Sequence, residues 1–240
     1  MKGSLSRGAG YLNRGARLLR HPSLRPFVIV PLLLNIVIFG TLIGIGFSYM
    51  SDLMSSMLAR IPSWLSFIQW ILWPLIGITV SLVTGYLFTS VALIIASPFN
   101  ALLAEKAEEL ITGRPVNGLE GMGAALLAIP RSALREIVKL LYYIPMALLA
   151  FLLSFIPGVG AVAWLLLGAW MMSIQFVDYP MDNHQMSFNQ VKAAVRSQRL
   201  SSLGFGALVA LCTAIPLVNF FVVPAAVVGA TLLWCEELDQ

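Results

Sequence analysis

Four long stretches of this chain contain no Asp, Glu, Lys or Arg: residues 26–51, 61–104, 140–177 and 200–235. A membrane-spanning helix needs about 20 mostly apolar residues, so the first stretch can hold one helix and each longer stretch two helical segments. Hydrophobic residues make up 59% of the chain and charged residues 11%, whereas soluble domains average about 45–50% and about 25%. We therefore expect an all-α integral membrane protein with one membrane domain over residues 1–240.

The N-terminal segment, residues 1–25, carries several basic residues and no acidic one. Arg7, Arg14 and Arg17 fall on one helical face, and leucines repeat every seven residues on another. This pattern predicts a basic amphipathic helix that lies on the anionic cytoplasmic leaflet. A disordered basic tail is the alternative.

Two long transmembrane helices are expected in the first half of the chain, at residues 27–49 and 72–97. Ser23 is a suitable N-cap for the first, and Pro98 marks the end of the second. The most charged part of the chain follows, and we expect it to form a cytoplasmic helical region at 105–139.

Proline breaks the third and fourth charge-free stretches near their middles, at Pro157 and Pro216. We expect a helical hairpin on each, over residues 140–177 and 200–235. The first leg of the first hairpin, 140–155, gives about 24 Å of helix, which is less than the hydrocarbon thickness of about 30 Å. Two alternatives stay open: the hairpins reach the far surface, or they only partly penetrate the bilayer and line a cavity.

Hairpins that enter and leave on the same side would place every basic residue except Arg60 on one side of the membrane. The positive-inside rule then puts both termini of this multi-pass protein in the cytoplasm. The basic residues are not interleaved with aromatic ones on a soluble module. Membrane lipid is therefore an expected partner, and nucleic acid is not.

Motifs for catalysis or metal binding are missing from the sequence. It contains no GxxxxGK[ST] loop, no HExxH and no GxSxG. His21 and His184 have no partner at a metal-ligand spacing, and Cys212 and Cys235 lack the CxxC pattern. We expect neither enzyme activity nor a cofactor nor a metal site.

Anion binding has better support, at the start of the first predicted span. The N-terminus of a helix presents unbonded N–H groups and the positive end of the helix dipole, and Arg25 stands in this first turn. The backbone amides around Leu24 and Arg25, together with the guanidinium, could hold an oxyanion there. The alternative is that Arg25 reaches out to lipid headgroups.

Polar residues inside the charge-free stretches are costly in lipid, so they should face protein or a water-filled path. Single ones could also bridge helices by hydrogen bonds. The segment 178–184 at the exit of the first hairpin holds two acids and a histidine. It could exchange protons with a path, or form a turn with side-chain capping. The polar residues of the stretches are Asn35, Gln69, Asn100, Gln175 and Asn219.

Five segments, in this order along the chain, resemble the CysZ family of bacterial sulfate permeases. They are Arg25-Pro26-Phe27-Val28 with Pro31-Leu32-Leu33-Leu34-Asn35, Ser97-Pro98-Phe99-Asn100-Ala101-Leu102-Leu103-Ala104-Glu105, Ile156-Pro157-Gly158-Val159-Gly160, Gln175-Phe176-Val177-Asp178-Tyr179-Pro180-Met181-Asp182-Asn183-His184, and Ile215-Pro216-Leu217-Val218-Asn219. The resemblance covers the chain from about residue 20 to 235.

The resemblance implies a homo-oligomeric protein of the bacterial inner membrane that imports sulfate as the sulfur source for cysteine synthesis. It also implies hairpins that penetrate only part of the bilayer, and a sulfate site at Leu24 and Arg25. Family members often have two consecutive arginines here, whereas this chain has Arg25-Pro26, so backbone amides would contribute more.

Further residues are expected along the sulfate path or at its polar entrance, and proton coupling stays open. The alternative function is a non-transporting membrane scaffold or regulator that shares the fold, because fold alone does not decide function. The expected path and entrance residues are Asn35, Asn100, Glu105, Arg131 and Arg135.

Overall fold

The computed structural model describes residues 3–58, 98–116 and 129–239, together with isolated positions between them, and every regular element in these ranges is helical. This confirms the predicted all-α class. The chain divides into two compact units, one formed by Met1–Val28 with Ser97–Gln240 and the other by Ile29–Ala96. Apart from isolated positions, the second predicted span at 72–97 lies outside the described residues.

The smaller unit contains most of α2 (Pro26–Leu58), a helix of 33 residues. The predicted first span, 27–49, falls within it. At 1.5 Å per residue, α2 is about 50 Å long, which exceeds the hydrocarbon thickness of about 30 Å. Large apolar side chains such as Leu33, Ile36 and Val37 are exposed along it.

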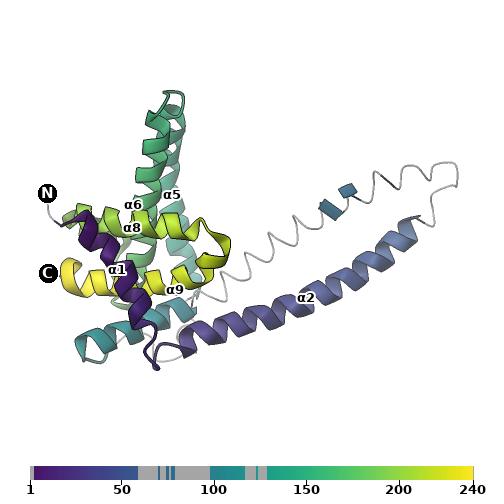
Figure 1. Ribbon diagram of the computed structural model, residues 1–240, viewed down its shortest axis with the longest axis horizontal. Coiled ribbons are helices and arrows are strands. Elements are labelled where there is room, and N and C mark those ends of the chain that lie inside the picture. The colour runs from purple at the N-terminus through teal and green to yellow at the C-terminus, as the bar shows by residue number, and fades with distance from the viewer. Residues whose placement is uncertain are drawn as a thin grey trace. The chain divides into compact units, whose positions relative to one another are not determined.

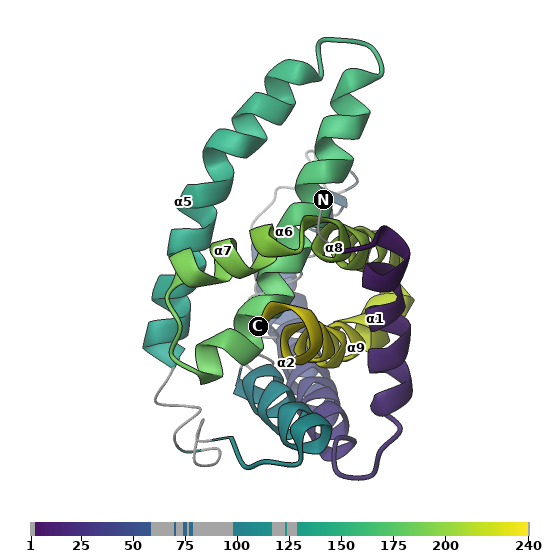
Figure 2. The ribbon, with the colours of Figure 1, turned by 90° about the vertical axis from the view of Figure 1, so that its left-hand side faces the viewer.

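The larger unit contains all the other elements. A helix over residues 98–112 precedes two antiparallel helical hairpins, which a short helix connects. In Figure 1 the first hairpin stands upright and the second runs across it, and Figure 2 shows the connecting helix lying across the first. The N-terminal helix is α1 (Leu5–Leu18). The first hairpin consists of α5 (Ile129–Leu153) and α6 (Val159–Asn183), and the connecting helix is α7 (Phe188–Ser197). The second hairpin consists of α8 (Arg199–Thr213) and α9 (Pro216–Leu233), and the π-helix η2 (Trp234–Leu238) follows it.

Proline and glycine explain the turns of both hairpins. Gly158 has a φ of 80°, a left-handed conformation that glycine adopts without strain, and it precedes α6 directly. Pro216 opens α9 at the first helical position, where its missing N–H costs no hydrogen bond.

Glycines let the helices of the larger unit approach closely. A Cβ at Gly206 of α8 would collide with the Ala169 carbonyl of α6, and one at Gly8 of α1 would collide with the Ser201 carbonyl of α8. Gly15 of α1 likewise lies against the backbone of α9 at Gly229. Such small-residue contacts are typical of helix packing in membranes, where the hydrophobic effect does not drive helices together.

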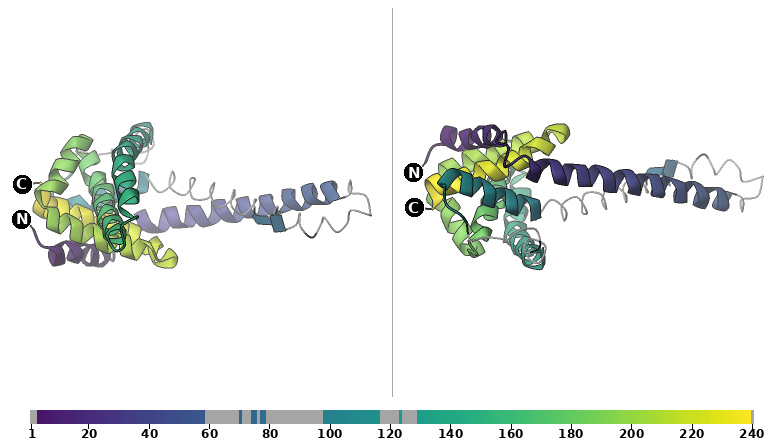
Figure 3. Two further views of the ribbon diagram at one scale, coloured as in Figure 1. Left: turned by 90° about the horizontal axis from the view of Figure 1, so that it is seen from above. Right: turned by 90° about the horizontal axis from the view of Figure 1, so that it is seen from below.

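The N-terminal helix α1 packs on α8 and α9 through its apolar face. Tyr11 and Leu12 are buried, and Figure 3 shows the purple α1 beside the yellow-green second hairpin. The Tyr11 hydroxyl donates a hydrogen bond of 3.0 Å to Glu237 of η2, and Arg14 pairs with the neighbouring Glu236. The amphipathic pattern predicted a lipid-facing helix, but protein covers this apolar face. Contact of α1 with the leaflet stays a prediction.

Three described segments are long and apolar enough to cross a membrane: Ala133–Leu153, Val159–Asn183 and Val218–Leu238. The turn of the first hairpin exposes large apolar side chains, including Phe155, whose exposed fraction is 74%, and Ile156. The second hairpin exposes Ile215 at its own turn and Phe221 shortly after it, in α9. An aqueous surface would disfavour such apolar groups, so lipid or protein is expected to cover both turns.

Candidate functional site

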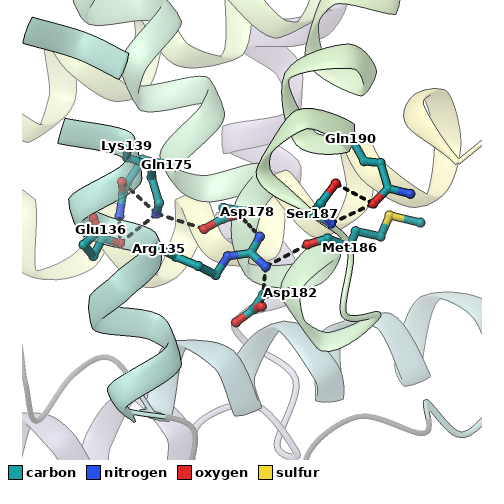
Figure 4. Close-up of polar contacts among 9 residues, drawn as sticks. All are labelled: Arg135, Glu136, Lys139, Gln175, Asp178, Asp182, Met186, Ser187 and Gln190. Carbon is teal, nitrogen blue, oxygen red and sulfur yellow. Dashed lines mark hydrogen bonds and ion pairs between the residues drawn. The ribbon is translucent and has the colours of Figure 1, made fainter. Parts of the chain in front are cut away.

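The base of the first hairpin holds a network of buried charges. Arg135 and Lys139 lie one helical turn apart on α5, and they face Asp178 and Asp182, one turn apart on α6 (Figure 4). Arg135 Nη1 is 2.5 Å from Asp182 Oδ1, while its Nη2 donates to Asp178 Oδ1. Lys139 Nζ is 2.9 Å from Asp178 Oδ2, so Asp178 bridges the two cations.

The network is largely withdrawn from water. The exposed fraction of Lys139 is 2% and that of Asp178 is 6%. Buried charges are tolerated when hydrogen bonds satisfy them. The network accordingly recruits neutral partners, because Lys139 Nζ lies 3.2 Å from Gln175 Oε1 and Arg135 Nη1 donates to the Met186 carbonyl at 2.7 Å.

A small cavity of about 30 Å³ lies against this network, lined also by Ala101 and Tyr179. One water molecule needs about 10–15 Å³ by such a measure, so this space holds about two waters. Glu136 adds a third carboxylate, 2.7 Å from Lys139 Nζ. The arrangement is therefore charge-paired and closed, without a surplus positive charge for an anion.

The helix over residues 98–112 is fastened to the same end of α6. Asn183 Nδ2 donates to the Ala101 carbonyl at 3.0 Å, and Asn100 Nδ2 donates to the Tyr179 hydroxyl at 3.4 Å. His184 Nε2 lies 2.7 Å from Glu108 Oε1. Burial raises the pKa of the Glu108 carboxyl above its ordinary value of 4.5, and the hydrogen bond to His184 opposes this rise.

The predicted anion-binding residues, Leu24 and Arg25, form hydrogen bonds with their own segment and not with the charge network. Arg25 is exposed in the turn that precedes α2, where its Nε and Nη2 donate to the Arg20 carbonyl at 3.0 and 2.8 Å. The Leu24 side chain is buried in the core, and its N–H donates to the His21 carbonyl at 3.1 Å. The guanidinium is thus held near the start of α2, but the Leu24 amide already has an acceptor.

The other predicted path residues divide between the two units. Arg135 is central to the network, and Asn100 donates to Tyr179, which lines the adjoining cavity. Glu105 is buried on the helix over residues 98–112, with Lys106 Nζ 4.0 Å away. Asn35 and Arg131 lie on α2 and α5, and their side chains are outside the described part of the structure.

Sequence reasoning missed Lys139, Asp178 and Asp182 as members of one cluster. The signal was present in the spacing, because residues 135 and 139 repeat at four, as do 178 and 182. Residues four apart share a helix face, and an antiparallel hairpin that turns at residues 156–158 brings these two faces together.

Metal ligands do not cluster within the described ranges, where no group of three or more His, Cys, Asp or Glu could hold an ion. The thiols of Cys212, on α8, and Cys235, on η2, are free.

Comparison with known proteins identifies relatives over nearly the whole chain. A family model described as sulfate transporter CysZ/etoposide-induced protein 2.4 matches residues 11–224. Three relatives carry the name sulfate transporter CysZ. The one from Pseudomonas aeruginosa is 43% identical over 96% of this chain and 95% of its own length. The Vibrio cholerae relative is 44% identical over 96% and 93%, and that from Pectobacterium atrosepticum is 42% identical over 96% and 85%. The chain therefore belongs to the sulfate transporter CysZ/etoposide-induced protein 2.4 family.

Proposed function

We propose that this protein carries sulfate across the bacterial inner membrane. The observation that carries the proposal is the similarity to relatives named sulfate transporter CysZ, which extends over 96% of the chain at 43% identity. The segments that are long and apolar enough to span a bilayer agree with this role. A transporter needs no catalytic motif, and we do not propose an enzyme.

Sulfate is first captured by Arg25 at the start of α2. Only two of the N–H groups of this exposed guanidinium donate to the Arg20 carbonyl, and a guanidinium has five. The remaining N–H groups can donate to an oxyanion, and the dipole at the first turn of α2 adds to the single positive charge of Arg25. The Leu24 N–H already donates to the His21 carbonyl and Pro26 has no N–H, so the Arg25 guanidinium carries a larger share of the binding than the backbone amides expected from the sequence.

Farther along, Arg135 and Lys139 are the cations of the buried charge network, and they can face an anion once they release the carboxylates of Asp178 and Asp182. Conduction requires binding that is strong enough for entry but weak enough for release. Asp178 and Asp182 meet this requirement, because their carboxylates compete with the anion for the same cations. The closed network is then the resting arrangement, and passage requires the cations to exchange partners.

The remaining features of the proposal follow from charge distribution and family resemblance. Basic residues concentrate on the segments that flank the hairpins, so both termini lie in the cytoplasm by the positive-inside rule. The protein is a homo-oligomer, and the imported sulfate serves cysteine biosynthesis. Asn35, Glu105 and Arg131 stay candidates for the path and its entrance.

Radiolabelled sulfate uptake into proteoliposomes that contain the purified protein tests the function. Uptake above that of empty liposomes is expected, and Arg25→Ala should reduce it, most strongly at low sulfate concentration. Arg114→Ala removes one exposed guanidinium elsewhere and serves as the control. A pH gradient of either sign separates passive from proton-coupled flux.

Two outcomes contradict different parts of the proposal. If the wild type takes up no sulfate with or without a pH gradient, the chain is better described as a scaffold or regulator with the same fold. If the wild type transports and Arg25→Ala matches it at every sulfate concentration, only the assignment of the capture site is wrong.

A further inference from the structure

A groove at the level of α7 joins two exposed arginines to an apolar surface. It measures about 400 Å³ and is lined by Tyr142 and Met146 of α5, Trp170 of α6, Arg196 of α7, and Arg199 and Leu203 of α8. It is a shallow, open groove and not an enclosed pocket, which suits a ligand that stays partly exposed to the surrounding lipid. Four helices thus build one site with a cationic rim and an apolar floor.

In the part of the chain that the structure describes, the positive charge at this rim has no protein counter-ion. Within the described residues, neither Arg196 nor Arg199 forms a salt bridge, and the segment 183–235 contains no Asp or Glu at all. Lys192 adds a third cation, with Nζ over the rings of Tyr142 and Phe188 at 4.9 and 5.0 Å from their centroids. An anion from outside the protein would complete the rim.

The apolar floor continues from this rim toward the turn of the hairpin. A second hollow of about 440 Å³ is lined by Leu153 of α5 and by Val162 and Leu166 of α6, among others. Leu153 lies two helical turns beyond Met146, and Leu166 one turn beyond Trp170, so both hollows share the same helix faces. From Trp170 to Val159, where α6 begins, the distance along the helix is about 16 Å, close to the half-thickness of about 15 Å of the hydrocarbon core.

The aromatic side chains suit the boundary between headgroups and acyl chains. Trp170 Nε1 donates to the Tyr142 hydroxyl at 3.2 Å, which fixes both rings at the level of the arginines. Trp and Tyr favour this interfacial depth because one end is apolar and the other polar. Basic pockets between membrane helices on the cytoplasmic side suit anionic headgroups.

We propose that this groove binds one anionic phospholipid. Arg196 and Arg199 hold the phosphate, and an acyl chain follows the floor past Met146 and Leu166 toward the turn at Pro157. A free oxyanion would use only the rim, whereas a phospholipid uses both the charge and the apolar length. The site is separate from Arg25 and from the Arg135 network.

Native mass spectrometry of the delipidated full-length protein in detergent tests this assignment with phosphatidylglycerol and phosphatidylcholine of equal chain length. The wild type is expected to bind one phosphatidylglycerol in preference to phosphatidylcholine. R196Q/R199Q should weaken phosphatidylglycerol binding about 30-fold, since each basic residue near a membrane surface contributes about a fivefold factor. M146W, which fills the floor and keeps both arginines, should also weaken binding.

K106Q/R114Q is the matched control, because it also removes two cations, from the helix over residues 98–112 and the segment after it, away from both the groove and α1. It should bind phosphatidylglycerol within about threefold of the wild type, and thermal melting without lipid verifies that each variant is folded. If both double variants lose phosphatidylglycerol binding equally, the lipid is attracted by diffuse positive charge and the proposed site is wrong. Equal binding of both lipids by the wild type would overturn it too, as would full competition by sodium sulfate or glycerol phosphate at equal ionic strength.

Discussion

Arg135 stabilises the first hairpin through a buried ion pair, because its side chain and that of Asp178 are exposed by only 13% and 8%. Truncation of one partner leaves a buried charge uncompensated, at a cost of about 3–5 kcal/mol. We expect Arg135→Gln to lower the free energy of unfolding by about this amount, measured by thermal or denaturant unfolding in detergent.

Arg14→Gln provides the comparison, since Arg14 and Glu236 are exposed by 44% and 38% and exposed pairs contribute about 0–1 kcal/mol. R135Q/D182N should recover part of the loss, because it also removes the Asp182 carboxylate that faces Arg135, while Asp178 keeps its pair with Lys139. If the Arg135 and Arg14 variants unfold alike, the network does not bear the stability assigned to it.

Glu108 predicts a pH dependence whose sign follows from its raised pKa. Burial makes the native state bind a proton here more tightly than the unfolded state does. The contribution of this group to stability is therefore fully present below its ordinary pKa of 4.5 and is lost as the pH rises through the raised value. The wild type should melt lower relative to Glu108→Gln as the pH rises from 4 to 8. Parallel melting profiles of the two proteins would contradict this.

At the scale of elements, the close contact between α8 and α6 at Gly206 predicts opposite effects for two glycine-to-alanine substitutions. A methyl group at Gly206 would collide with the Ala169 carbonyl, whereas one at Gly168 of α6 meets nothing within 4 Å. Gly206→Ala should destabilise by about 1–3 kcal/mol through overpacking. Gly168→Ala should stabilise by up to about 1 kcal/mol, because alanine favours the helix. The melting temperatures of the two variants in one detergent measure these stability changes. A Gly206→Ala variant that melts higher than the wild type would contradict the contact between α8 and α6.

Different parts of the fold and the site were predictable to different degrees. The charge-free stretches predicted the all-α class, since few folds besides membrane helices accommodate them. Arg135 was predicted as a polar residue of the entrance, but its partners depend on the register of α5 against α6, which a single helix pattern does not specify. The packing of α1 on α8 was not predictable either, because Gly8 and Gly204 are small residues with no charge or periodicity that marks their partners.

At the scale of the whole molecule, the depth of the first hairpin can be predicted from helix lengths. Tyr142 lies at the interfacial level inferred above, and Phe155 lies about 20 Å farther along. This depth falls inside a hydrocarbon core of about 30 Å. A spin label at Phe155→Cys, in a C212A/C235A background and in lipid vesicles, should collide readily with oxygen and rarely with the polar relaxant nickel-EDDA.

A label at Arg114→Cys, in the exposed segment after the helix over residues 98–112, should show the opposite preference and calibrates the measurement. Free access of nickel-EDDA to position 155 would mean that the hairpin reaches the far aqueous surface. Such a result would favour the fully spanning alternative and would contradict the partly penetrating hairpin that the family resemblance implies.

The bond between Tyr11 and Glu237, 226 residues apart, also affects how the protein is made. Chains grow at about 5–20 residues per second, so α1 leaves the ribosome roughly 10 to 50 s before its packing partners exist. During that interval no protein covers the apolar face of α1, and we expect this face to bind the membrane surface. The final assembly step is then the transfer of α1 from lipid to the second hairpin, and a ribosome that stalls before residue 200 would leave α1 without that partner.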